Sequence, residues 1–197
     1  MTGVVGHLGA PSGRGAAATA VAVRASRGQC VRVASSSSVA LADWDAVVCA
    51  GDGSLPNGQA FDTDVRQWQT LLDEIVRKGW PMTFARDGDS VPVPSAEDAF
   101  ALSARASVSF TVWPAPGVQV NIFPLESRSI DFDFDLRELS TQPALDGLCG
   151  FVRVVGTAAR RDVFLTAEGD DDARFCVYRH SAGLFELLSP QTQQHCR

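Results

Sequence analysis

Three aspartates alternate with apolar residues in the segment 130–136, which reads Ile-Asp-Phe-Asp-Phe-Asp-Leu. In a β-strand, side chains two residues apart lie on the same face, roughly 7 Å from each other. Asp131, Asp133 and Asp135 are therefore expected to form one acidic face opposite an apolar one. That spacing is wide for a single metal ion, because carboxylate oxygens bind Ca²⁺ at about 2.3–2.6 Å. The pattern favours a solvated strand face that can dock a basic partner, and no metal site is predicted.

A second pattern is a glycine-rich turn after an apolar run, Val-Val-Cys-Ala-Gly-Asp-Gly-Ser at 47–54. It resembles the strand and Gly-Gly-Asp-Gly-Ser/Thr loop of the lipid-kinase and NAD-kinase families, where glycines let the backbone approach a nucleotide phosphate. The resemblance covers these eight residues, with alanine at the place of its first glycine. It implies phosphate binding at Gly51, Asp52, Gly53 and Ser54. Gly-Asp-Gly is also ordinary turn sequence, and we favour that interpretation.

The remaining reactive side chains form no catalytic set. His180 and Cys176 are four residues apart near a predicted strand end, roughly 13 Å along an extended chain, which is too far for proton transfer. His7 and His195 lie in the terminal segments, and the aspartates at 170–172 suit a solvated turn. The chain contains no Gly-x-Ser-x-Gly sequence of a nucleophile elbow. We therefore favour a non-enzymatic function and predict no catalytic residue and no cofactor.

The five cysteines, at 30, 49, 149, 176 and 196, are an odd number, widely spaced and without a Cys-x-x-Cys pair. This pattern argues against a disulfide framework and favours a reducing compartment, so a cytoplasmic location is expected. No run of about 18 apolar residues is present, so we expect no membrane-spanning helix.

Helical and strand periodicities predict an α+β fold. The clearest helix covers residues 63–78, where Asp62 can cap the start and Gly79 the end, and a second helix covers 143–159. A short helix is predicted at 95–103, behind the capping sequence Ser-x-x-Asp. Strands are predicted at 44–50, 82–86, 107–113, 118–123, 130–136, 163–166, 175–178 and 184–188. We expect two layers, with a mostly antiparallel or mixed sheet and both main helices on one face.

The order of these elements repeats once along the chain, because each main helix is followed by a strand and then a hairpin. The chain can therefore consist of two degenerate helix–strand–hairpin units, or of ordinary α+β connections. Trp113 precedes Pro114 at the predicted tip of the first hairpin. A tryptophan there either locks the local packing or anchors a protein interface.

Residues 39–189 are expected to form a single domain, followed by a polar tail at 190–197. Residues 1–38 show no periodicity and are predicted to be a disordered leader. A targeting peptide or a signal sequence would also fit them, but we favour a start codon assigned too far upstream.

The charge distribution narrows the choice of partners. The chain carries a net charge of −6, and residues 1–38 hold four arginines and no acidic residue, which leaves −10 for the rest. Such a domain repels phosphate backbones, so we expect no nucleic-acid partner. The leading hypothesis is an acidic protein-binding domain, in its sharpest form an inhibitor or immunity-type protein that neutralises a basic partner. The alternatives are a nucleotide- or phosphate-binding enzyme that uses the Gly51–Gly53 loop, and a structural domain that forms homo-oligomers.

Overall fold

The computed structural model describes residues 31–48 and 54–189. Its strands form one antiparallel sheet in the order β1-β10-β9-β8-β2-β7-β6-β5-β3-β4. The strands are β1 Val31–Ser36, β2 Asn57–Phe61, β3 Met82–Arg86, β4 Asp89–Val91, β5 Val108–Ala115, β6 Val118–Phe123, β7 Ser129–Phe134, β8 Val163–Ala167, β9 Asp170–Arg179 and β10 Leu184–Ser189. The α-helices are α1 Leu41–Val47, α2 Val65–Arg77, α3 Ala96–Ser103 and α4 Gln142–Ala159, and η1 Leu136–Leu139 is a 3₁₀-helix.

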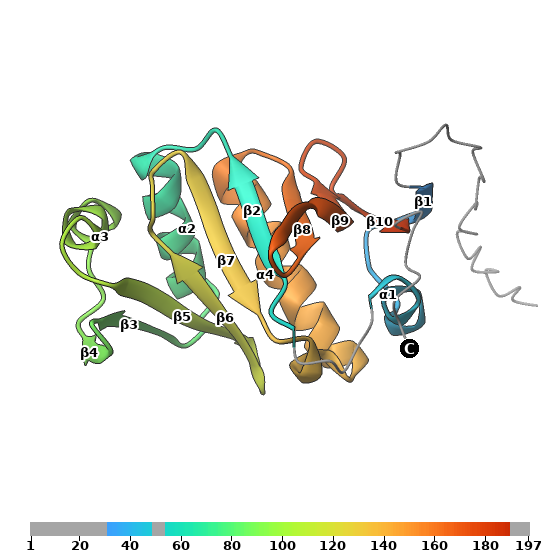
Figure 1. Cartoon of the computed structure of the whole chain (residues 1–197), viewed down its shortest axis with the longest axis horizontal. Coiled ribbons are helices and arrows are strands. Elements are labelled where there is room, and N and C mark those ends of the chain that lie inside the picture. Colours follow the sequence, from blue (N-terminus) through green and yellow to red (C-terminus); the bar gives the residue numbers. More distant parts are fainter. Residues whose placement is uncertain (1–30, 49–53, 190–197) are drawn as a thin grey trace, which may run out of the picture.

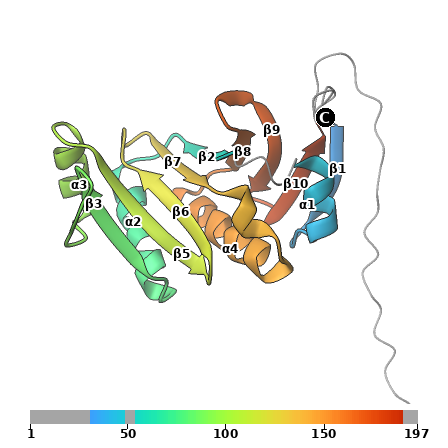
Figure 2. The same ribbon diagram turned by 60° about the horizontal axis from the view of Figure 1, so that its bottom comes forward.

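Helices α2 and α4 pack against each other and cover one face of the sheet (Figures 1 and 2). The short helix α3 packs against α2, and α1 contacts β10 near the other end of the sheet. The predicted α+β architecture, with two main helices on one face of an antiparallel sheet, is confirmed. No helix in the described residues is long and apolar enough to span a bilayer.

Helix α2 begins two residues after its predicted start and ends before Gly79, as predicted. The Asp64 side chain accepts a hydrogen bond of 2.9 Å from the backbone N–H of Gln67, so Asp64 is the N-cap in place of the expected Asp62. Gly79, at φ 69°, ends the helix in the left-handed conformation. The buried indole of Trp68 donates to the carbonyl of Ser129 at 2.9 Å, which fastens α2 to the start of β7.

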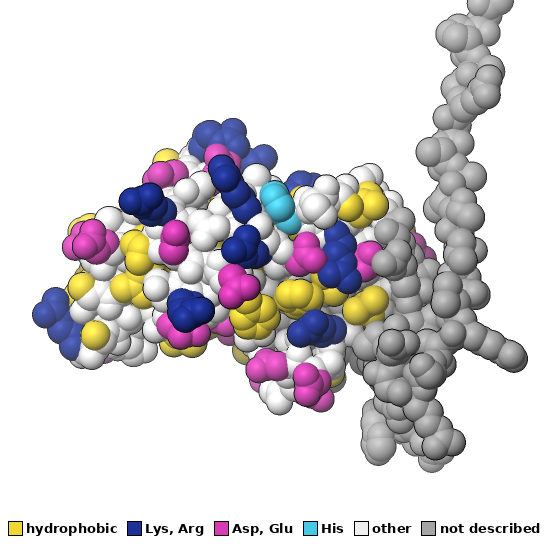
Figure 3. Space-filling view, turned by 90° about the horizontal axis from the view of Figure 1, so that it is seen from above, with side chains coloured by type: hydrophobic (Ala, Val, Ile, Leu, Met, Phe, Trp, Pro, Cys, Tyr) yellow, Lys and Arg dark blue, Asp and Glu magenta, His cyan; other side chains and the backbone are white. Residues whose placement is uncertain are grey.

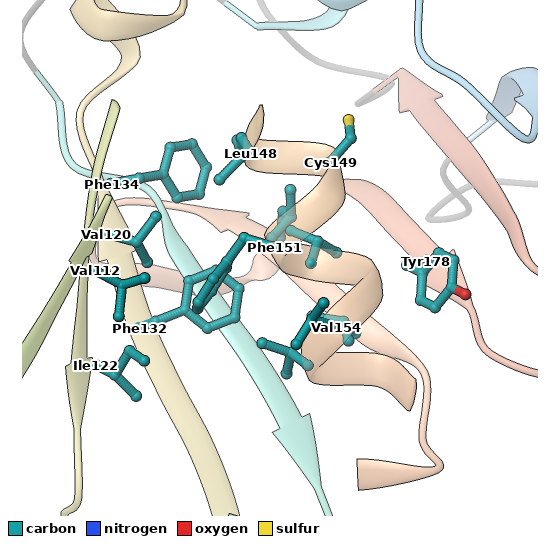
Figure 4. Close-up of a cluster of buried hydrophobic side chains, with 14 of the residues drawn as sticks. Val112, Val120, Ile122, Phe132, Phe134, Leu148, Cys149, Phe151, Val154 and Tyr178 are labelled. Atoms are coloured by element: carbon teal, nitrogen blue, oxygen red, sulfur yellow. The ribbon is translucent and has the colours of Figure 1, made fainter. Parts of the chain in front are cut away.

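Helix α4 supplies most of the helical side of the core. Figure 4 shows Leu148 and Phe151 of this helix facing Val120 and Phe132 of the sheet, and the rings of Phe151 and Phe132 meet edge to face at 5.2 Å. The glycines that weaken its helix propensity permit close packing. A Cβ at Gly147 would overlap Ala115 of β5, and a Cβ at Gly156 would meet the Tyr178 ring at 2.6 Å.

Three local expectations differ from the structure. The apolar run predicted as a strand at 44–50 is helix α1 over its described part, in which Trp44 and Val47 are buried and lie on one helical face. Strand β2 falls in a segment that we interpreted as turn. The edge strand β1 lies within the predicted leader and pairs with β10, so part of residues 1–38 joins the sheet.

The two helix–strand–hairpin segments are present as α2–β3–β5–β6 and α4–β8–β9–β10. In each, the three strands are neighbours, and they follow one another in the same direction along the sheet. Five antiparallel pairings separate β3 from β8, so these two strands run in opposite directions. Because of this reversal, one segment does not superpose on the other by a shift along the sheet.

Candidate functional site

The sheet face opposite α2 and α4 carries the acidic residues that the sequence singles out. Asp131 and Asp133 are half-buried on the central strand β7, and each is opposite residues of β2 and β6. In Figure 1, strands β2, β6 and β7 lie in front of α2 and α4, and no described α-helix is drawn over them from this side. We call the side chains of Gln59, Asn121, Phe123, Asp131 and Asp133 the open face.

Side-chain amides hold both carboxylates of the open face. Gln59 donates to Asp131 Oδ1 at 3.2 Å, and the Ser129 hydroxyl donates to Oδ2 of the same carboxylate. Asn121 donates to Asp133 Oδ1 at 2.8 Å, while its own oxygen accepts from Thr111 at 3.1 Å. Two separate sets of hydrogen bonds therefore fix the direction of the carboxylates, one across β2 and β7 and the other across β5, β6 and β7.

The protonation of these groups is shifted by their surroundings. Burial raises the pKa of Asp131, against the opposing hydrogen bonds of Ser129 and Gln59, and the negative charges of Glu126 and Asp171 raise it further. Burial also raises the pKa of Asp133, and the charge of Glu168 adds to that rise. These three neighbouring acids mean that the open face lies in a negative field.

Asp135 does not belong to the open face. Strand β7 ends at Phe134, and Asp135 caps η1 by accepting from the backbone N–H of Arg137 at 2.8 Å. Its carboxylate also bonds the Arg137 guanidinium, and this side-chain hydrogen bond lowers the pKa of Asp135. The predicted row of three aspartates is therefore a pair, because the chain leaves the strand before the third.

Trp113 lies within β5 and not at a hairpin tip. Val112 is opposite Val120 and Ala115 is opposite Val118, so Trp113 and Pro114 together face the single residue Gln119 in a β-bulge. The Trp113 side chain is half-buried. At this bulge the backbone N–H of Gln119 donates a hydrogen bond of 2.7 Å to the Glu138 carboxylate.

Three residues of the alternative phosphate site, Gly51, Asp52 and Gly53, lie outside the described residues. Ser54 is half-buried. The next residue, Leu55, donates its backbone N–H to Glu168 at 3.0 Å. In the described part of this segment, the backbone N–H that follows Ser54 is therefore bonded to the carboxylate of Glu168.

A cavity of about 420 Å³, which we call the end cavity, lies where strand β2 ends and strand β8 begins, and the sequence analysis missed it. It is lined by Phe61, Asp62, Arg160, Arg161, Asp162, Phe164, His180 and Ser181. These residues come from three stretches of the chain that are far apart in sequence, so no local motif indicates the cavity. The adjacent Arg160 and Arg161 are its only sequence signal.

Thiol and metal chemistry have little support in the described residues. Burial raises the pKa of Cys149 to about 12 and that of the fully buried Cys176 well above its usual value. Both thiols are free and protonated at neutral pH. Within residues 31–48 and 54–189, no group of three or more His, Cys, Asp or Glu side chains is placed to hold a metal ion.

Comparison with known proteins identifies no relative. No protein-family model matches the chain, and neither the curated proteins nor the solved structures contain a significant match. The assignment of a function therefore rests on the geometry and charge of the surface.

Proposed function

We propose that this domain binds a basic protein through the open face of its sheet. The observation that carries the proposal is the pair Asp131 and Asp133, which are half-buried, held by neighbouring amides and uncovered by any described helix. A surface of this kind presents fixed acceptors to arginine or lysine side chains. It resembles the polar part of a protein interface, where charge sets register and partner choice.

The surrounding charge supports a cationic partner. Glu126, Glu168 and Asp171 each raise the pKa of an open-face carboxylate, so the field at this surface is negative. Residues 39–197 carry a formal charge of −10, which extends attraction to cations beyond the contact itself. Because complementary charge steers encounters, the negative field mainly increases the association rate.

Preorganisation supports the same proposal. The Asp131 and Asp133 side chains are already ordered in the free domain, so binding does not have to immobilise them. Their raised pKa values mean that burial disfavours their charged forms, and a guanidinium placed beside them would offset that cost. Binding of a basic partner should therefore lower both pKa values and release protons when the pH is near them.

The most specific version of this proposal is an inhibitor or immunity-type protein that neutralises a basic toxin or enzyme. Carboxylates that occupy a basic active or binding surface would block it without any chemical step. Trp113, half-buried on β5, is a candidate aromatic contact at the margin of this surface.

The test captures partners from the cells that encode the protein and compares four forms of the full chain. The first is wild type, the second has Asp131→Arg and Asp133→Arg, and the third has Asp45→Arg and Asp73→Arg. Asp45 and Asp73 are exposed on α1 and α2, so the third form carries the same change in charge away from the open face. An isosteric pair, Asp131→Asn and Asp133→Asn, covers the case in which buried arginines disturb folding.

We expect wild type and the Asp45/Asp73 form to retain a basic protein that the Asp131/Asp133 forms lose. With the purified partner, Asp131→Asn with Asp133→Asn should slow association about tenfold at low salt, and the difference should shrink as salt rises. Recovery of this chain alone would overturn the proposal in favour of a homo-oligomer. Equal loss of the partner in both charge-reversed forms would place the interaction outside the open face.

A further inference from the structure

We propose that the end cavity binds a small organic acid that carries one negative charge and a flat apolar body. Its volume of about 420 Å³ is within the range of small-molecule pockets. The proposal is independent of the docking function, because it rests on a different group of residues and a different class of ligand. Figure 3 shows this end of the molecule, with the histidine in cyan among basic side chains.

Two guanidinium groups supply the positive charge of the cavity. Arg160 and Arg161 are exposed, and within the described part of the chain neither forms an ion pair. Asp162 does not neutralise them, because its carboxylate accepts from Arg179 at 2.8 Å and from the His180 backbone N–H at 2.9 Å. Among the described residues that line the cavity, only Asp62 remains to offset one of the two positive charges, which favours a monoanion.

His180 contributes a polar atom that lacks a partner. Its Nδ1 is buried, and no described residue forms a hydrogen bond with it. A buried polar atom left in this state is unfavourable, because it has lost its hydrogen bond to water and gained none in return. The Asp162 carboxylate accepts from the His180 backbone N–H and holds this residue at the cavity, where a ligand oxygen would supply the missing partner of Nδ1.

Two phenylalanine rings form the apolar wall. Phe61 is 41% exposed, and its ring lies 6.0 Å from that of Phe164 at an angle of 38°. The Arg174 guanidinium stacks on Phe164 at 4.2 Å and helps to fix that ring. A partly exposed aromatic pair beside Arg160 and Arg161, which form no ion pair among the described residues, is suited to a flat ring that bears a carboxylate.

Backbone strain is concentrated at the same place. Asp62 at φ 56° and Arg160 at φ 54° are two of the three non-glycine residues with positive φ in the described ranges, and both line the cavity. Arg160 occupies the left-handed C-cap of α4, a position usually taken by glycine. Strained residues of this type persist at ligand sites more often than elsewhere.

The test titrates the full chain with four probes while recording NMR shifts of the His180 ring and of the Phe164 and Ser181 amides. The probes are benzoate, its neutral analogue benzamide, acetate without a ring, and phenyl phosphate with a second charge. We expect benzoate to shift these signals and to bind at least tenfold more tightly than each of the others. Equal binding of benzamide, preference for phenyl phosphate, or no shift of these signals at 10 mM benzoate (roughly the weakest useful affinity) would overturn the proposal.

Variants separate binding from folding. Arg161→Gln and Arg160→Gly should each weaken benzoate binding about tenfold, whereas Arg105→Gln, an exposed arginine at the end of α3, should leave it unchanged. Arg160→Gly also relieves the positive φ, so lost binding in that variant cannot be attributed to unfolding. Unchanged affinity in both cavity variants would remove the two arginines from the site and overturn the proposal.

Discussion

Gln59 and Asp131 face each other across the two central strands of the sheet, and the Gln59 amide donates a hydrogen bond of 3.2 Å to the Asp131 carboxylate. One member of the pair belongs to the alternating segment that the sequence makes conspicuous, and the other to a strand that the sequence analysis interpreted as turn. The amide keeps the carboxylate directed along the open face although burial disfavours its charge. The acidic surface therefore depends on a residue that carries no charge itself.

The substitution Asp133→Asn should stabilise the domain at neutral pH. Burial raises the pKa of this carboxyl in the fold, so protonation favours the folded state. That contribution is full below the pKa of the unfolded chain, near 3.8, and is lost as the pH rises through the higher folded pKa. Asparagine keeps an acceptor for Asn121 and carries no charge. We expect a gain of about 0.5 kcal/mol at pH 7, since the group is partly solvated.

Urea unfolding of wild type and Asp133→Asn between pH 3 and pH 8 measures this difference. It should disappear toward pH 3, where the native carboxyl is protonated as well. Asp73→Asn, on the exposed surface of α2, is the matched control and should show no comparable trend. A wild type that gains stability relative to Asp133→Asn as the pH rises would contradict the expected sign.

The substitution Gly58→Ala should destabilise the domain by about 2–3 kcal/mol through overpacking. A Cβ at position 58 would overlap the Phe132 ring, and that ring cannot move away because Phe151 packs edge to face against it. The double variant Gly58→Ala with Phe132→Leu should recover part of the loss, since leucine vacates the space. A thermal-unfolding cycle of wild type, both single variants and the double variant measures the coupling. Additive losses would show that the methyl group is accommodated elsewhere.

How much of this fold the sequence predicts depends on whether its signals are local. Helix α2 was predicted because cap, apolar face and terminal glycine lie within one stretch, and each signal acts on neighbouring residues. Strand β2 was missed because Asn57–Phe61 has no alternating pattern, and its place follows from contacts with Phe132 and β8. The seven residues of α1 are too few for apolar periodicity to separate helix from strand.

The two candidate sites also differ in whether a local sequence pattern indicates them. Asp131 and Asp133 share a strand, so the period of two predicted their common face, but it could not show where the strand ends and Asp135 begins to cap η1. The end cavity joins Phe61 to Arg160 and His180, which approach one another only because β2 pairs with β8. Such a site is a property of sheet order, which the spacing of residues along the chain does not encode.

The thiols of Cys149 and Cys176 should be unreactive in the folded protein. Burial raises the pKa of Cys149 to about 12, and Cys176 is also well above its usual value, so the nucleophilic thiolate is scarce at pH 8. In a variant with serine at 30, 49 and 196, Ellman's reagent should detect no fast thiol in buffer and both thiols in urea. Rapid labelling of either thiol in buffer would contradict the burial that we describe.

The substitution Arg179→Met should cost about 2–3 kcal/mol of folding stability, although Arg179 is partly exposed. Its guanidinium bonds Asp162 at 2.8 Å and Glu186 at 2.9 Å, and the Glu186 side chain is only 8% exposed. Methionine keeps the length of the side chain and removes both charged hydrogen bonds. Arg105→Met is the control, and chemical unfolding of both variants is the measurement. A loss below about 0.5 kcal/mol would class the Arg179 pairs with ordinary surface ion pairs.

The substitution Arg160→Gly should stabilise the domain by about 1 kcal/mol, because glycine adopts the left-handed C-cap conformation without the steric cost of a Cβ. Arg160→Ala removes the same guanidinium but keeps the Cβ, so it should give no such gain. Thermal unfolding of the two variants beside wild type separates strain from charge. A gain in Arg160→Ala equal to that in Arg160→Gly would mean that charge repulsion with Arg161 is the dominant cost. If only glycine stabilises, the chain keeps arginine at a position where it weakens the fold, as expected of a residue retained for binding at the end cavity.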